Sequence, residues 1–165
     1  MKLRRILLSW DLLLPLSSSL VLGWWLPEWV PSELAKDYYG IGITVLSILF
    51  AVFLAALVVI ITASDDDFIT FLEETGAYSA IVANFRFSLR LLFVAMMYSL
   101  VFYAYTAARI SNTVHHQAKY FLTVFCFLFL WSLFATFSST EDAIMYRNYR
   151  QKFTEAKQRS RNSRA

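Results

Sequence analysis

The chain has 165 residues, of which 58% are hydrophobic, 18% aromatic and only 16% charged, and its formal net charge is +3. Soluble domains average roughly 45–50% apolar and about 25% charged residues, so these proportions exclude both an ordinary water-soluble domain and a disordered chain. Its four glycines, three prolines and single cysteine exclude collagen-like and disulfide-rich classes. The class that fits is an integral membrane protein.

Four apolar stretches are long enough to cross a membrane, because a bilayer core of ~30 Å needs about 20 mostly apolar residues in a helix. They predict an all-α fold, a four-helix transmembrane bundle that occupies residues 1–140. The third stretch belongs to a helix that we expect to begin near Tyr78. The four predicted spans are residues 6–26, 39–63, 86–108 and 120–138.

The first span is the weakest of the four and has two interpretations. A basic start at residues 2–5 followed by an apolar run is typical of a cleaved signal peptide. However, Asp11 interrupts the run, and the Trp-Trp-Leu-Pro sequence at residues 24–27 lacks the small residues of a cleavage site. We therefore expect a retained transmembrane helix.

Basic residues predict the orientation of the chain, because Lys and Arg are retained on the cytoplasmic side. With both termini inside, 12 of the 15 basic residues face the cytoplasm, and only Lys36, Arg109 and Lys119 lie outside. Trp and Tyr residues, which anchor at membrane interfaces, gather near the outer boundary. The expected location is the inner (cytoplasmic) membrane, with short outer loops at about 27–37 and 109–119. The net charge then reflects a cytoplasmic tail, and we expect no nucleic-acid binding.

The segment between the second and third spans is acidic. We expect residues 64–85 to form a helical hairpin that projects inward, with Ser64 and Asp67 in a capping-box pattern and Gly76 as a helix stop. Alternatively, the second span continues as one helix to about Thr75. The carboxylates indicate helix capping and solubility, a partner-docking surface, or an acidic ring at a pore mouth that concentrates cations. They are Asp65, Asp66, Asp67, Glu73 and Glu74.

Residues 141–165 form a basic tail with seven Lys or Arg residues and three acidic ones. Met145, Tyr149, Phe153 and Ala156 recur at helical spacing, so we expect the fourth span to continue into the cytoplasm as a C-terminal helix. The tail is expected to bind anionic membrane lipids or a cytosolic protein. The basic residues that would make these contacts are Arg147, Arg150, Lys152, Lys157, Arg159 and Arg161.

Three charged residues lie at membrane depth in the predicted topology. Arg86 and Arg90 are one turn apart and share a helix face, and Asp11 lies at a similar depth in the first span. Charges at this depth find a partner or a wet cavity, or snorkel to the interface. The alternatives are pairing of Asp11 with Arg90, pairing of Arg86 with the acidic tip, and contact with lipid phosphate.

Small residues recur at every fourth position of the second span, at Ser47, Ala51 and Ala55. Such a stripe lets two helix backbones approach closely. It serves either packing within the chain or contacts between copies in a homo-oligomer.

The sequence predicts no enzymatic activity. It contains no Gly-rich phosphate loop, no H-E-x-x-H and no G-x-S-x-G motif, so we expect no catalytic residues and no cofactor. His115 and His116 are adjacent, point in different directions on a helix and have no third ligand near them in sequence, so we expect no metal site.

The acidic element Ser64 to Gly76, followed by Phe85-Arg86-Phe87, resembles small four-pass prokaryotic membrane proteins of anti-phage defence systems, such as the membrane subunit of the Kiwa system. The resemblance covers about residues 38–103. It implies an oligomeric membrane scaffold or sensor that works with a soluble effector.

Together these observations favour a homo-oligomeric inner-membrane protein. Its acidic hairpin and basic tail would recruit or signal to a cytosolic effector in anti-phage defence. The alternative is an oligomeric pore that permeabilises or depolarises the membrane.

Overall fold

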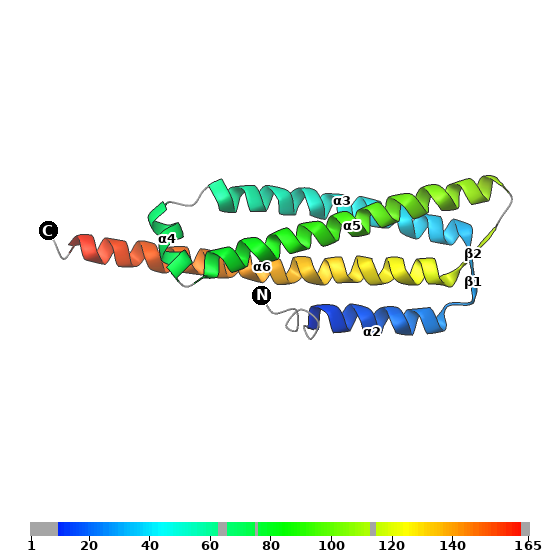
Figure 1. The fold of residues 1–165 in the computed structure, drawn as a ribbon, viewed down its shortest axis with the longest axis horizontal. Coiled ribbons are helices and arrows are strands. Elements are labelled where there is room, and N and C mark those ends of the chain that lie inside the picture. The colour runs from blue at the N-terminus through cyan, green and yellow to red at the C-terminus, as the bar shows by residue number, and fades with distance from the viewer. Residues whose placement is uncertain (1–9, 63–65, 75, 113–114, 163–165) are drawn as a thin grey trace.

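The computed structural model describes residues 10–62, 66–74, 76–112 and 115–162 (Figure 1). The expectation of an all-helical chain is confirmed, apart from one small two-stranded ribbon. The elements are α2 (Trp10–Trp25), β1 (Trp29–Pro31), α3 (Ser32–Thr62), α4 (Asp66–Glu74), α5 (Ala77–Ser111), β2 (His116–Ala118) and α6 (Lys119–Asn162).

Within the described residues, three helices are long and apolar enough to cross a membrane. The first predicted span is described only from Trp10, where α2 begins, and the 16 residues of α2 cover about 24 Å, less than a bilayer core. A fourth crossing therefore stays a prediction. The three candidate spans are Ser32–Thr62, Ala77–Ser111 and Lys119–Glu155.

The surfaces of these helices fit a lipid environment. On α3, the side chains of Ile48, Val52 and Val59 expose 57–60% of their surface. Soluble monomers rarely expose contiguous apolar surface of this extent. Lipid tails, in contrast, are as apolar as these side chains, so the same surface is stable within a bilayer.

The helices form an elongated bundle. α3, α5 and α6 pack side by side, and α2 lies along α6 on the side away from α3 and α5 (Figure 1). α6 has 44 residues and is about 66 Å long, more than twice the thickness of a bilayer core. Its C-terminal part projects beyond the bundle, and α4 lies against it. We call α4 and residues 141–162 of α6 the charged end.

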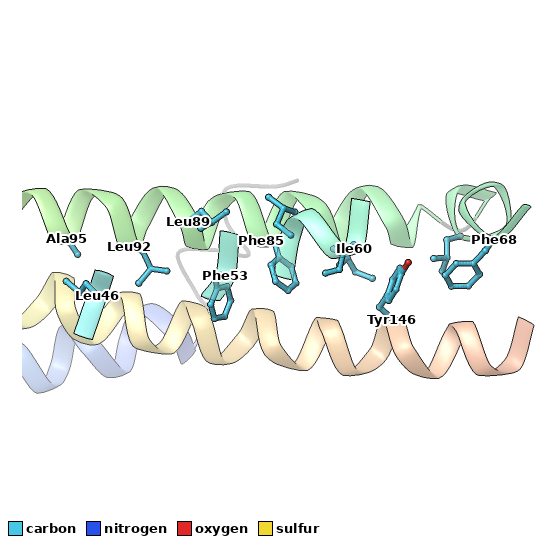
Figure 2. Packing of buried hydrophobic residues seen from close by; sticks show 12 residues of the cluster. Leu46, Phe53, Ile60, Phe68, Phe85, Leu89, Leu92, Ala95 and Tyr146 are labelled. Carbon is cyan, nitrogen blue, oxygen red and sulfur yellow. The ribbon is translucent and has the colours of Figure 1, made fainter. Parts of the chain in front are cut away.

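One buried apolar cluster joins the bundle to the charged end. Figure 2 shows its side chains in a row between α5 and α6, with Leu46, Phe53 and Ile60 contributed by α3. The row ends at Phe68 of α4 and Tyr146 of α6, which face each other. The charged end is therefore an extension of the packed core.

The ribbon of β1 and β2 closes the opposite end of the bundle. We call this ribbon, together with the ends of α3, α5 and α6 beside it, the ribbon end. β1 and β2 pair antiparallel, with Val30 opposite Gln117, and both of these side chains are buried. Beneath the ribbon, the Nε2 of Gln117 donates to the Tyr39 hydroxyl at 3.2 Å, and the Thr106 hydroxyl donates to Oε1 of Gln117 at 3.0 Å. The sequence pattern did not indicate this ribbon.

The ribbon also explains why the predicted loop at 27–37 was too long. α3 begins at Ser32, seven residues before the predicted second span. The Ser32 backbone N–H donates to the His115 carbonyl at 2.9 Å, which fixes the first turn of α3 to the residue that precedes β2. Glu33 in this turn also suits the positive end of the helix dipole. The third predicted span, residues 86–108, lies inside the longer α5, which begins close to the expected Tyr78.

The turn after α4 has the geometry expected for Gly76. Its φ is +66°, a left-handed value that glycine adopts without strain, and its N–H donates to the Glu73 carbonyl at 2.9 Å. This bond ends α4, and α5 begins at Ala77. The alternative of one continuous helix from the second span to about Thr75 is wrong, because α3 ends at Thr62 and α4 is a separate helix. The proposed cap Ser64 lies outside the described residues.

Candidate functional site

α4 is fixed to α6 by aromatic packing. The ring of Phe68 lies 5.4 Å, between centroids, from both Tyr146 and Phe153 of α6. Phe68 is only 2% exposed and Leu72, one turn further along the same helix face, is 1% exposed. The acidic helix and the basic tail are thus joined through apolar contacts inside one chain.

The predicted acidic residues lie at both ends of α4. Asp66 and Asp67 are its first residues, where carboxylates suit the positive end of the helix dipole, and Asp65 lies outside the described residues. At the other end, Glu73 is exposed, and its Oε1 accepts a hydrogen bond from the Ser79 hydroxyl at 2.5 Å. Glu74 is the last residue of α4.

The predicted basic residues all lie on α6, which continues as a helix to Asn162. Arg147 and Arg150 are exposed and line a shallow surface hollow of about 510 Å³ together with Gln151, Thr154 and Glu155. Arg159 is also exposed. The helical continuation expected after the fourth span is therefore present, and it carries Lys152, Lys157 and Arg161 as well.

Arg86 and Arg90 line a groove between α4 and α5. Its volume is about 690 Å³, and its other lining residues include Ile69 and Glu73 of α4 and Ser79 and Val82 of α5. Both arginines are exposed. The structure thus brings Arg86, Arg90 and one member of the acidic tip, Glu73, to a single concave surface. The sequence predicted that the two arginines share a helix face, but it did not predict that α4 lines the other side of the groove.

Asp11 does not join these arginines. It lies in the first turn of α2, which packs along α6 on the side opposite to α5 (Figure 1). Within the described part of the chain, no ion pair links Asp11 to Arg86 or Arg90. The expected pairing of Asp11 with Arg90 is wrong for this arrangement, because α6 separates the two helices.

A polar seam between α5 and α6 lies where the charged end begins, and the sequence analysis missed it. The Nδ2 of Asn84 donates to Oδ2 of Asp142 at 2.7 Å. One turn further along α5, the Ser88 hydroxyl contacts Oγ of Ser139 at 2.7 Å and the Ala135 carbonyl at 3.0 Å. Buried polar groups require such partners. The sequence signal for this seam was the spacing of Asn84 and Ser88, which lie one turn apart on α5. Their partners could not be found from this spacing, because they lie about 50 residues further along the chain.

The small-residue stripe divides between two surfaces. The Ser47 hydroxyl contacts the sulfur of Met96 at 3.4 Å, so Ser47 faces α5, whereas Ala51 and Ala55 are exposed. At Gly42 α3 packs tightly against α6, because an added Cβ there would lie 2.6 Å from the Phe125 ring. This tight contact is made by a glycine outside the stripe.

No group of three or more His, Cys, Asp or Glu residues is placed to hold a metal ion among the residues that the structure describes. His115 and His116 are both exposed at the ribbon end, and the His115 carbonyl serves the backbone contact with Ser32.

Comparison with known proteins gives no match to a protein family, to a curated protein or to a solved structure.

Proposed function

We propose that this chain is an inner-membrane protein that holds a docking surface for a cytosolic protein, formed by the charged end. The observation that carries the proposal is the course of α6. This helix passes without a break from a candidate span into the charged end, and α4 packs on it through Phe68. A flexible tail loses much conformational entropy on binding, whereas a folded surface loses less.

The charge distribution supports docking of a protein with its own charge pattern. Acidic residues at both ends of α4 lie beside a helix whose exposed residues include Arg147, Arg150 and Arg159. Charge complementarity between two proteins contributes more to the specificity of binding than to its affinity. We expect such an association to weaken as salt increases, because exposed charges are screened within about 10 Å at 0.1 M ionic strength.

The excess of basic residues supports a cytoplasmic position for the charged end. A direct test replaces Cys126 with serine and introduces a single cysteine by Gln158→Cys at the charged end or Glu28→Cys at the ribbon end. We expect an impermeant maleimide added to intact cells to label the Glu28→Cys chain and to leave the Gln158→Cys chain unlabelled. The reverse pattern would contradict the proposed orientation.

The docking surface is tested by charge reversal on the full chain. In-cell cross-linking and quantitative proteomics should detect cytosolic proteins bound to the wild type, and Arg147→Glu with Arg150→Glu should reduce their yield about tenfold, because each reversed charge changes a complementary contact. The matched control is Lys36→Glu with Arg109→Glu at the ribbon end, which should leave the yield unchanged. Equal loss in both variants, or in neither, would contradict the proposal.

We propose that the chain assembles into homo-oligomers through the exposed Ala51 and Ala55 of α3. Small exposed residues allow close contact of helices in lipid. Ala51→Leu with Ala55→Leu should lower the particle mass measured by light scattering in detergent, and Val52→Leu, a neighbouring exposed position, should not. A monomeric wild-type particle would contradict this part of the proposal.

The resemblance to membrane subunits of anti-phage systems supports a soluble defence effector as the cytosolic partner. The test is phage plating on cells that carry this chain together with the protein encoded beside it. We expect phage plating to fall only in cells that carry both proteins. With the charge-reversed variant in place of the wild type, plating should return to the level of unprotected cells. Plating that is unaffected by either protein would contradict the defence role.

A further inference from the structure

We propose that the groove lined by Arg86 and Arg90 binds the headgroup phosphate of an anionic phospholipid from the membrane leaflet on the side of the charged end. The observations that lead to this proposal are the position of the groove along α5, the lack of partners for its two arginines among the residues that the structure describes, and the apolar surface that continues from it.

The position of the groove follows from the length of α5. The helix segment between Arg86 and Arg109 spans about 34 Å, and that between Arg90 and Tyr105 about 22 Å. These values bracket the ~30 Å thickness of a bilayer core. With Tyr105 at one interface, Arg86 lies about 28 Å away along the helix axis, near the opposite boundary of the core, and Arg90 lies about 22 Å away, from where its long side chain extends toward the headgroups.

The arginines of the groove differ from the cations of the ribbon end. There, the guanidinium of Arg109 lies 5.6 Å from the centroid of the Tyr105 ring and donates to its hydroxyl at 3.2 Å, and the ammonium of Lys36 lies 5.8 Å from the Tyr103 ring. Arg86 and Arg90 have no hydrogen bond or ion pair within the described residues. Two guanidinium groups one turn apart offer several N–H donors to phosphate oxygens.

The surface next to the groove suits an acyl chain. On the face of Arg90, the side chains of Phe93, Val94 and Met97 follow at helical spacing toward the ribbon end, and all three are exposed. Within the groove, Val82 and Ile69 are half-buried. A phosphate at the arginines therefore places a lipid tail along apolar surface in the direction of the bilayer centre.

Glu73 opposes an anion in the groove, and its charge makes the proposal testable in both directions. Its carboxylate lines the same surface and is held by the Ser79 hydroxyl. Two positive charges and one negative charge leave the lining with a net charge of +1. Glu73→Gln keeps an acceptor for Ser79 and removes the opposing charge, so it should strengthen binding of an anionic headgroup.

The experiment measures lipid retention by native mass spectrometry of the full chain, after exchange into detergent with added phosphatidylglycerol or phosphatidylcholine. We expect the wild type to retain phosphatidylglycerol in preference to phosphatidylcholine. Arg86→Gln with Arg90→Gln should weaken retention about 30-fold, because each basic residue at an anionic surface contributes roughly fivefold. Glu73→Gln should increase retention of phosphatidylglycerol above that of the wild type. Arg86→Lys with Arg90→Lys keeps both positive charges and should retain most of the phosphatidylglycerol that the wild type retains.

Arg109→Gln is the matched control, because it removes one arginine of the same helix at the ribbon end. It should retain phosphatidylglycerol like the wild type. Equal retention by the wild type and the double glutamine variant, or equal retention of both lipids, would overturn the proposal. Should the glutamine pair fail to fold, Glu73→Gln still decides: unchanged or weaker retention in that variant would overturn it.

A final arm separates lipid from free phosphate. Inorganic phosphate at 10 mM, a concentration of roughly physiological order, should neither raise the melting temperature of the detergent-purified wild type nor displace bound phosphatidylglycerol, since a single anion lacks the contribution of the acyl chains. Stabilisation by inorganic phosphate without lipid retention would assign the groove to a soluble anion and overturn the lipid proposal.

Discussion

The ribbon end and the charged end solve the same structural problem in different ways. Both ends terminate helices that are long and apolar enough to cross a membrane, and both carry polar groups. At the ribbon end, Gln117 is fully buried and bonds to Tyr39 and Thr106, and the cations lie over tyrosine rings. At the charged end, the contacts of Phe68 with Tyr146 and Phe153 fix α4, and Arg147, Arg150 and Arg159 are exposed. The ribbon end thus buries its polar contacts, whereas the described arginines of the charged end lie at the surface.

The largest effect should follow from removing the aromatic contact at the charged end. Phe68→Ala deletes a buried ring, a change that typically costs about 3–5 kcal/mol, and the loss should release α4 while the spans stay folded. Hydrogen exchange should show loss of protection confined to residues 66–74. Phe137→Ala, which removes an exposed ring from α6, is the control and should change nothing there. Loss of protection throughout the spans would show that the two ends are not independent.

A smaller effect is expected at the ribbon end. Gln117→Leu keeps the volume of the side chain but removes the partner of both Tyr39 and Thr106, and each buried polar group left unsatisfied costs about 1–3 kcal/mol. Thermal unfolding in detergent should show a lower melting temperature. Gln151→Leu, at an exposed position of the charged end, should leave it unchanged. An unaltered melting temperature for Gln117→Leu would contradict a structural role for this network.

Close to the ribbon end, two glycines of α3 allow a matched comparison. Gly42→Ala places a Cβ 2.6 Å from the Phe125 ring and should cost about 1–3 kcal/mol through overpacking. Gly40→Ala places its Cβ at 3.5 Å from Tyr103, an ordinary contact, and should be neutral or slightly stabilising because alanine favours the helix. Equal effects of the two changes on the free energy of unfolding would contradict the tight contact between α3 and α6.

The smallest effect concerns the seam where the charged end begins. Asn84→Ala removes the donor to Asp142 and should cost about 1 kcal/mol, since both side chains are only partly buried. A double-mutant cycle with Asp142→Ala isolates the contact, and we expect a coupling energy of similar size. Asn148→Ala, which changes an exposed asparagine on α6, is the control and should leave the free energy of unfolding unchanged. Additive effects of the two changes on the free energy of unfolding would show that the contact between Asn84 and Asp142 does not stabilise the charged end.

Composition and local pattern predicted where the described helices lie but not where each of them begins. Residues 39–62 contain no charge and lie within α3, which begins earlier, at Ser32, and Gly76 follows α4 because its left-handed backbone suits glycine. The spacing of Arg86 and Arg90 placed them correctly on one helix face.

Contacts between distant segments were not predictable in the same way. Tyr39, Thr106 and Gln117 come from three elements, and no local pattern marks them as partners. The docking of Phe68 on α6 depends on a chain separation of about 80 residues, where hydrophobicity alone indicates burial but not the partner. The wrong pairing of Asp11 has the same origin: similar depth in a membrane does not decide which helices are neighbours.

The unbroken course of α6 has a mechanical consequence. Its 44 residues include no glycine and no proline, so no position within it favours a kink. The part beyond residue 141 then moves as a lever attached to the spanning part. A tilt of about 10° at the membrane boundary displaces the far tip by roughly 5 Å over this length. Any such tilt of α6 is therefore transmitted to the exposed Arg147, Arg150 and Arg159 near its far end.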